Sequence, residues 1–213
     1  MSSNQQQVLA RVIWIGGGTD SGKTSAAQIL AERHGLRAYH YDKHDLAHHQ
    51  KLAETIPAYR DFLAASLDER WVYPQVRELF ERTLQSFRDR FPLVIDDLMS
   101  LPLERGVVAE GFGLLPELLA PLLSDPTQAL WLVPSKAFKE SSMDRRGKPS
   151  FRHQVGDPVK ARANLLERDR LLAEHIRAEA LKLGYTVYEV DGGRTVEQMA
   201  DWMERQFADF LTN

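Results

Sequence analysis

The chain has 213 residues, of which 43% are hydrophobic, enough for one sizeable core in a single domain spanning 1–213. Its formal net charge is only -3, so no global positive field draws it to nucleic acid or to an anionic membrane. Cysteine is absent, which excludes disulfides and thiolate metal sites. The polar N-terminus lacks a signal-peptide pattern, and proline and glutamate interrupt the Leu-rich stretch 114–123. We therefore expect a cytoplasmic protein with neither a membrane nor a nucleic-acid partner.

The predicted elements alternate between strands and helices. Residues 8–15 form a short β-branched run that ends at glycines, and the apolar spacing after residue 23 predicts a helix that stops at Gly35. A second strand is predicted at 37–42, and the residues that follow it, 43–105, form a helical insertion over the carboxyl edge of the sheet. Three more strands are predicted at 106–111, 129–133 and 185–190. Five strands separated by helices indicate an α/β protein with a parallel sheet covered on both faces.

Two further helices have clear start signals. Asp157 as N-cap and Pro158 as first helical residue predict a helix that runs to Gly184. Thr195 and Gln198 form a capping-box pattern at the start of the last helix.

A glycine-rich loop follows the first predicted strand. Gly17, four residues, Gly22, Lys23 and Thr24 match a phosphate-cradling pattern, in which main-chain N–H groups turn inward around phosphates. Lys23 would supply a positive charge to the β and γ phosphates and Thr24 a hydroxyl to Mg²⁺. A chance match in an ordinary glycine turn is the alternative, but the strand before and the helix after favour nucleotide binding. The predicted nucleotide-binding residues of this loop are Gly17, Gly18, Thr19, Asp20, Ser21, Gly22, Lys23, Thr24 and Ser25.

Such a loop needs an acidic partner near the metal, and two candidates stand at strand ends. Asp42 follows the second strand and Glu110 ends the third, so both would face the crevice at the carboxyl edge of the sheet. Asp45 competes with Asp42 for this role, and a solvated acid at a strand end is the alternative for each. We predict that Thr24, Asp42 and Glu110 hold the metal.

The segment 136–162 concentrates basic residues, with eight Lys and Arg against three Asp and Glu. It is rich in Gly, Ser and Pro and lies between a strand and a long helix, which is typical of a mobile flap. Such a flap could bring Arg145, Arg146 or Arg152 over a triphosphate. A solvated basic loop is the alternative.

The insertion contains two weaker patterns. His40, His44 and His48 stand four residues apart, a spacing that could bind zinc on a helix, although histidines near anionic ligands are common. Aromatic and basic residues of the insertion could hold an acceptor substrate, but a packed aromatic pair with surface arginines explains them nearly as well. These residues are Arg60, Arg70, Trp71, Tyr73 and Arg77.

With these motifs in order, the chain resembles the small P-loop kinases that act on nucleosides, nucleotides and small metabolites. The landmarks are "GGGTDSGKT" and Asp42; "VVAEGFG", similar to the adenylate-kinase "DGF" segment with Glu110 in place of Asp; the Arg-rich "DRRGKPSFR"; and "EVDGGRTVEQMADW". The resemblance implies a P-loop NTPase three-layer sandwich with a five-stranded parallel sheet in the order 2-3-1-4-5. It also implies an acceptor-binding insertion after strand 2 and a lid at 136–157 after strand 4.

The resemblance implies roles for particular residues. Lys23 and Thr24 would hold phosphate and Mg²⁺, Glu110 would orient the metal through water, and a lid arginine would stabilise the transferring phosphoryl group. The turn at 191–193, with Gly192, would approach the nucleotide base. The catalytic set predicted in this way is Lys23, Asp42, Arg145 and Arg152, with Arg146 among the nucleotide-binding residues.

One departure from the family narrows the acceptor. Nucleotide kinases continue after the glycine-phenylalanine pair with Pro and Arg, whereas this chain has Gly113 and Leu114. A hydroxyl-bearing acceptor, activated by Asp42 or another carboxylate, fits better than a nucleoside monophosphate. The sequence thus predicts an ATP- and Mg²⁺-dependent transfer of the γ-phosphate to a small hydroxylated metabolite, nucleoside or antibiotic-like acceptor. An ATP-binding or ATP-hydrolysing regulatory protein without an acceptor is the alternative.

Asp20 is a carboxylate inside a loop that would hold phosphates. Because the positive field of such a loop comes from main-chain N–H groups and Lys23, this side chain can point away from the phosphates at little cost. Two interpretations are open: Asp20 contacts the acceptor or its counterion, or it is a solvated loop carboxylate.

Overall fold

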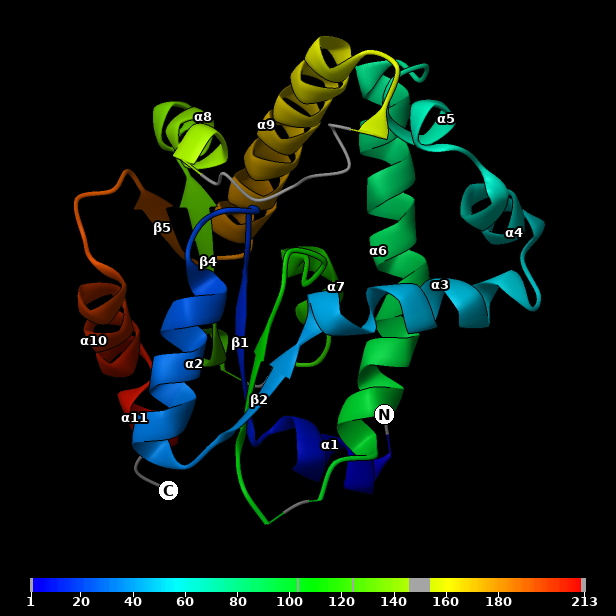
Figure 1. Ribbon diagram of the computed structural model, residues 1–213. Coiled ribbons are helices and arrows are strands. Elements are labelled where there is room, and N and C mark those ends of the chain that lie inside the picture. Colours follow the sequence, from blue (N-terminus) through cyan, green and yellow to red (C-terminus); the bar gives the residue numbers. More distant parts are fainter. Residues whose placement is uncertain (1, 103, 124, 146–153, 212–213) are drawn as a thin grey trace.

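The computed structural model describes residues 2–102, 104–123, 125–145 and 154–211. Its centre is a five-stranded sheet in the order β2-β3-β1-β4-β5, and every neighbouring pair is parallel (Figure 1). The strands are β1 (Val12–Gly17), β2 (Arg37–His40), β3 (Val107–Glu110), β4 (Ala129–Pro134) and β5 (Thr186–Val190). The predicted α/β class, the parallel sheet and the strand order are therefore confirmed.

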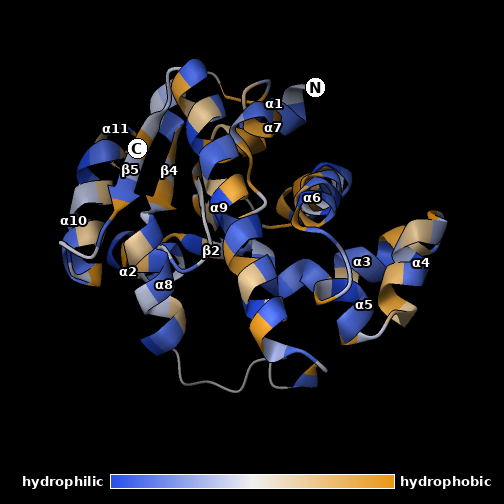
Figure 2. Cartoon of the chain, turned by 90° about the horizontal axis from the view of Figure 1, so that it is seen from above, coloured by the Kyte–Doolittle hydropathy of each residue, from blue (hydrophilic) through white to orange (hydrophobic). Residues whose placement is uncertain are grey.

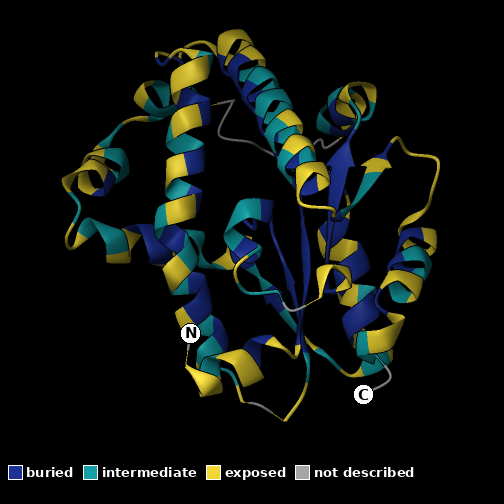
Figure 3. Cartoon of the chain, turned by 180° about the vertical axis from the view of Figure 1, so that it is seen from behind, coloured by how far each residue is buried: buried dark blue, intermediate teal, exposed yellow. Residues whose placement is uncertain are grey.

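Helices cover both faces of the sheet and make three layers (Figure 1). One face carries α2 (Lys23–His34), α10 (Val196–Gln206) and α11 (Ala208–Leu211). The other carries α1 (Ser3–Leu9), α6 (Val76–Met99), α7 (Pro116–Leu119) and α9 (Pro158–Lys182). Every residue of β1 and β4 is buried (Figure 3). The reason is that helices cover both faces of the sheet, so side chains that point to either face lie in a core. Trp14 belongs to the core on the α6 and α9 side, and Ile13 and Ile15 to the core on the α2 and α10 side.

The insertion after β2 is helical, as predicted. A 3-10 turn η1 (Tyr41–His44) leads into α3 (Asp45–Ala53), α4 (Pro57–Ala64) and α5 (Leu67–Trp71), and then into α6. Seen from above, α3, α4 and α5 project beyond α6, away from the sheet (Figure 2). The remaining elements are η2 (Pro126–Gln128) and α8 (Lys136–Arg145), which follow α7 and β4 in the chain.

The predicted first strand is wrong over its first four residues, 8–11. Residues 8 and 9 end α1, whose N-cap Ser2 accepts a hydrogen bond at Oγ from the Gln5 amide at 3.2 Å. Val8 and Leu9 are buried at the end of this short helix, so their apolar character reflects helix packing and not a strand. The second strand also stops early, because residues 41 and 42 turn into η1.

The predicted flap begins as a helix: residues 136–145 form α8. Residues 146–153, with Arg146 and Arg152, lie outside the described part of the chain. The other helix signals are confirmed, since Asp157 caps α9 through the Lys160 amide at 2.9 Å and Thr195 and Gln198 form a capping box on α10. Among the described residues, no helix is both long and apolar enough to cross a bilayer.

Candidate functional site

The glycine-rich loop joins β1 to α2 at the carboxyl end of the sheet, and the backbone there requires glycine. A Cβ on Gly17 would lie 2.0 Å from the carbonyl oxygen of Leu132, and φ at Gly17 is 125°. A Cβ on Gly16 would lie 2.2 Å from Trp131 Nε1. Gly22, the N-cap of α2, has φ 77°. The loop main chain therefore runs directly against β4 and delivers the N-terminus of α2 to the edge of the sheet.

Lys23 is a buried cation at the centre of this loop. Its side chain is almost fully enclosed, and Nζ donates to the Gly18 carbonyl oxygen at 3.1 Å. Burial lowers the pKa of Lys23, and the nearby carboxylates of Asp42 and Glu110 work in the opposite direction. The ammonium group is thus held inside the loop, next to two carboxylates.

Glu110 ties the loop to the second and third strands. It ends β3, stands level with Ile15 of β1 and His40 of β2, and is only 1% exposed. Its Oε2 accepts a hydrogen bond from Thr24 Oγ1 at 3.0 Å, and its Oε1 lies 2.8 Å from His40 Nδ1. Two residues that are predicted to hold a metal, Thr24 and Glu110, are therefore in direct contact.

Asp42 lies in η1, is exposed, and lines a cavity described below. Burial raises its pKa, Lys23 lowers it, and Glu110 raises it further. Asp45 is different, because it forms an ion pair with Arg90, which is 1% exposed, and also contacts His49. The structure therefore separates the two candidates: Asp42 shares the electrostatic environment of Lys23, and Asp45 is part of an ion pair with α6.

These residues fit the chemistry of a magnesium site. Thr24, Asp42 and Glu110 offer a hydroxyl and two carboxylates, the oxygen ligands that Mg²⁺ prefers, and Mg²⁺ in such sites is completed by water and substrate phosphates. The sequence predicted this group, and the structure brings its members together around Lys23.

Asp20 is neither solvated nor turned to the open side of the loop. Its side chain is 9% exposed and pairs through Oδ2 with Lys139 Nζ of α8 at 2.5 Å. Its backbone has a positive φ of 65°. The same ammonium group lies 2.7 Å from Asp169 Oδ2 of α9 and also donates to Thr19 Oγ1, which donates in turn to Asp169 at 2.8 Å. The expectation of a solvated loop carboxylate is wrong, because a lysine from the basic segment compensates the charge.

Asp169 completes this buried network. Although burial by itself raises its pKa, the charges of Arg168 and Lys139 outweigh that effect and lower the pKa of Asp169 to about 2. The Arg168 guanidinium binds Asp169 Oδ1 through both Nε and Nη2, at 2.9 and 2.6 Å. Sequence reasoning missed Lys139 and Asp169. The basic segment was a signal for Lys139, but nothing in the spacing identified Asp169.

A cavity of about 660 Å³ opens beside Asp42, between η1, the inserted helices and α9. Aromatic side chains form part of its walls, together with three arginines, Arg82, Arg90 and Arg168, and three aspartates, Asp42, Asp45 and Asp89. Burial lowers the pKa of Arg82; Glu78 counteracts this, while Arg168 and Arg70 lower it further. No ion pair to Arg82 occurs among the described residues, and its Nη2 donates to the Arg70 carbonyl at 2.6 Å. The aromatic lining residues are Tyr59, Phe62, Trp71, Phe87 and Phe112.

A second cavity of about 580 Å³ lies on the other side of the loop, between α8, α9 and the ends of β4 and β5. Gly18 and Thr19 form part of its wall. The loop therefore lines this second cavity, and α9 contributes residues to the walls of both cavities.

The remaining predicted residues lie at the margins. Arg145 is exposed at the end of α8, with its guanidinium 5.6 Å from the centroid of the Phe138 ring. Gly192 has φ 92°, and a Cβ there would lie 3.0 Å from the same ring. Of the predicted acceptor residues, Trp71 lines the first cavity, whereas Tyr73 is 66% exposed. Arg60 and Arg77 are also exposed, and Arg70 lies over the Phe62 ring at 4.8 Å.

No protein-family model and no curated protein matches the chain. Among solved structures, an uncharacterized protein from Eubacterium ventriosum is similar over 93% of this chain and 98% of its own. The two are 13% identical and superpose with a TM-score of 0.40.

Proposed function

We propose that the protein is a P-loop phosphotransferase that uses ATP and Mg²⁺ to phosphorylate a small hydroxylated molecule. One observation carries this proposal. Buried Lys23 lies within a glycine loop whose Thr24 is bonded to Glu110, and Asp42 stands between this group and a separate cavity. A loop for the triphosphate, oxygen ligands for Mg²⁺ and a carboxylate facing an acceptor space are the parts that phosphoryl transfer requires.

In this mechanism the residues mainly position charge. Main-chain N–H groups of the loop, the N-terminus of α2 and Lys23 bind the β and γ phosphates. Thr24, Glu110 and Asp42 hold Mg²⁺, which supplies charge neutralisation when bound. Asp42 also accepts the proton of the acceptor hydroxyl as its oxygen forms the bond to the γ-phosphorus, while the bond to the bridging oxygen breaks and ADP leaves. A lid arginine, Arg145, Arg146 or Arg152, stabilises the transferring group.

The cavity beside Asp42 indicates the kind of acceptor. Its aromatic walls suit a flat or partly apolar molecule, and Arg82 suits an anionic substituent because a guanidinium group binds carboxylate and phosphate oxygens in a planar, bidentate way. We assign to this cavity a hydroxylated acceptor with one anionic group.

A Lys23→Ala variant tests the phosphate site. We expect loss of a charge that acts on the transferring phosphoryl group to reduce ATP turnover and transfer by about 100-fold or more. The assay is a screen of a metabolite pool with labelled ATP, with Lys51→Ala as the control because Lys51 forms an exposed pair with Glu54. Normal turnover by Lys23→Ala would contradict the assignment.

The same screen separates the kinase from a regulatory ATP-binding protein. A phosphorylated product supports the kinase, whereas tight ATP binding without product for any acceptor favours the regulatory protein. A regulatory GTPase is disfavoured because the chain contains no Asn-Lys-x-Asp guanine signature.

A further inference from the structure

A second group of polar side chains lies apart from the glycine loop, where α3 crosses α6. His44 ends η1 and is the N-cap of α3, His48 follows one helical turn later, and Asp97 lies in the last turn of α6. Two histidines four residues apart project from the same side of a helix. The spacing noted in the sequence therefore brings His44 and His48 together, whereas His40 is hydrogen-bonded to Glu110.

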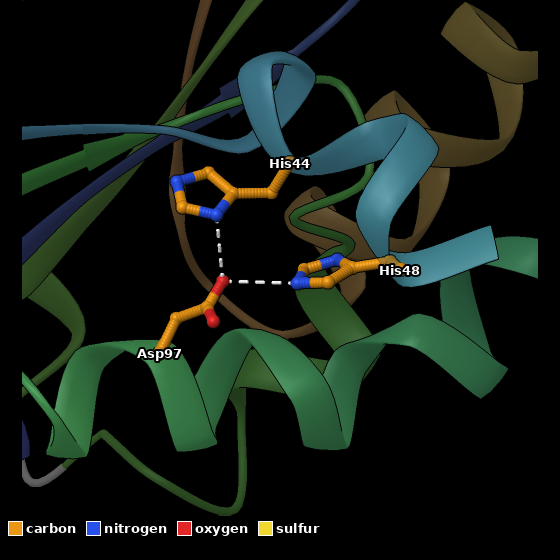
Figure 4. A group of neighbouring side chains, drawn as sticks. All are labelled: His44, His48 and Asp97. Carbon is orange, nitrogen blue, oxygen red and sulfur yellow. Dashed lines mark hydrogen bonds and ion pairs between the residues drawn. The ribbon is translucent and has the colours of Figure 1, made fainter. Parts of the chain in front are cut away.

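The two imidazole rings converge on one carboxylate oxygen (Figure 4). Asp97 Oδ2 lies 3.0 Å from His44 Nδ1 and 2.9 Å from His48 Nε2. The three atoms all lie within 4.8 Å of one another, close enough to share one ion. His48 and Asp97 lie in two helices that contact each other, and His44 lies at the junction of η1 and α3.

The three side-chain partners of the Asp97 carboxylate among the described residues all lie at the same oxygen, Oδ2. Tyr39 Oη also donates to Asp97 Oδ2, at 2.7 Å, so with both histidines as donors three protons would meet at one oxygen. In the part of the chain that the structure describes, no partner is found for Asp97 Oδ1. A cation in place of the two imidazole protons would relieve this crowding and leave Tyr39 as a hydrogen-bond donor that orients the carboxylate. The Tyr39 ring stacks on His44, with centroids 4.6 Å apart, and restricts its orientation.

The donor set is the one that zinc takes when a coordination position stays open. Two imidazole nitrogens and a carboxylate oxygen bind Zn²⁺ with a water molecule in the fourth position. The His48 side chain is 6% exposed, whereas those of His44 and Asp97 are 39% and 31% exposed. The group is therefore fixed on the His48 side and open to solvent on the His44 side, which gives an ion a path of entry.

We propose that His44, His48 and Asp97 form a binding site for Zn²⁺ or a similar transition-metal dication. The ion joins η1 and α3 to α6. Because Asp42 is two residues before His44 in η1, the same ion fixes the backbone that presents Asp42 to the glycine loop. The site is separate from the Thr24 and Glu110 group and does not depend on the proposed function.

Zinc titration of the full chain, expressed without a histidine tag and stripped with a chelator, tests this site. We expect one equivalent of Zn²⁺ to bind by calorimetry and to raise the unfolding temperature, since an ion that binds only the folded state stabilises it. His44→Ala removes an accessible ligand and should weaken binding by at least about 10-fold, because even residues that only support metal ligands have effects of that size.

His175→Ala is the matched control, because His175 also contacts a carboxylate, that of Glu117, at 2.8 Å but outside this group. It should bind zinc as the unchanged chain does. Asp97→Ala provides a second ligand variant should His44→Ala fail to fold. The proposal is overturned if the unchanged chain does not bind one equivalent of zinc, or if both ligand variants bind it as tightly as the control.

Discussion

At the scale of single residues, the glycine loop is held by charges from two helices. Lys139 of α8 pairs with Asp20 of the loop and with Asp169 of α9, and all three side chains are nearly buried. Asp20 also has a backbone conformation that L-residues rarely adopt, so the loop geometry depends on the surrounding contacts. The loop carboxylate therefore serves to attach the loop to the helices that follow β4.

Replacement of Lys139 by Met tests this network. The variant keeps the length of the side chain but leaves Asp20 and Asp169 without the ammonium group, and removing one partner of a buried pair costs about 3–5 kcal/mol. We expect the free energy of unfolding in urea to fall by that amount. Lys51→Met, at an exposed pair, should change it by less than about 1 kcal/mol. Equal stabilities of the two variants would contradict the role of Lys139.

The candidate site was predictable only in part from the sequence. Lys23 and Thr24 carry a local motif, and Asp42 and Glu110 follow strands whose ends had to meet at one edge of a parallel sheet. Lys139 is 119 residues from Asp20 in the chain, and no spacing rule connects two side chains across such a distance. Of the residues predicted to hold an acceptor, only Trp71 lines the cavity, because its walls come from η1, the inserted helices and α9.

At the scale of elements, the errors occurred where short apolar runs allow more than one structure. Only two residues separate Val8 and Leu9 from the β-branched residues of β1, so periodicity alone does not distinguish helix from strand there. The composition of the basic segment predicts a loop, whereas Lys136–Arg145 forms a helix that buries Lys139 and Ser142. Caps were reliable signals, since Asp157 and Thr195 both bind the amides that the patterns required.

The side-chain amide of Asn164 connects the long helix α9 to the inserted helices. Asn164 Nδ2 lies 3.0, 3.3 and 3.4 Å from the carbonyl oxygens of Trp71, Val72 and Pro74, and its side chain is buried. These residues form the connection from α5 to α6, and Trp71 lines the cavity beside Asp42. One side chain thus joins α9 to a wall of the proposed acceptor space.

An Asn164→Ala variant should lose about 1–3 kcal/mol of unfolding free energy, because buried carbonyl oxygens lose their donor. Thermal unfolding measures the loss. Gln28→Ala is the control, since Gln28 is an exposed amide whose bond to Glu32 stays within α2, and such pairs contribute about 0.2–0.5 kcal/mol. A variant at 164 no less stable than the control would show that the three carbonyl contacts do not hold the connection.

At the scale of the whole molecule, the strand order decides where a ligand can bind. The connection after β1 leads towards β2, whereas the connection after β3 crosses β1 to reach β4. Connections from these neighbouring strands therefore run in opposite directions and open a crevice at their carboxyl ends. The glycine loop lies at this point and lines one cavity, and Asp42, which follows β2, lines the other. Alternation of strands and helices was enough to predict a parallel sheet, whereas the strand order came only from the resemblance to small P-loop kinases.

The network around Asp169 makes the stability of the whole molecule depend on pH. Asp169 has a folded-state pKa of about 2 against 3.8 for an unperturbed aspartate, so between these values the unfolded chain binds more protons. Its contribution is complete above the unfolded pKa and is lost as the pH falls from about 5 towards 2. The shift corresponds to about 2 kcal/mol.

Asp169→Asn should abolish this part of the acid sensitivity. We expect the variant to be less stable than the unchanged chain at pH 7 and the difference between the two to shrink by about 2 kcal/mol as the pH is lowered from 5 to 2. Denaturant unfolding at a series of pH values measures both curves. Asp96→Asn, at an exposed carboxylate, is the control and should follow the unchanged chain. If the Asp169→Asn curve instead runs parallel to that of the unchanged chain, the pairing of Asp169 with Arg168 and Lys139 does not stabilise the fold.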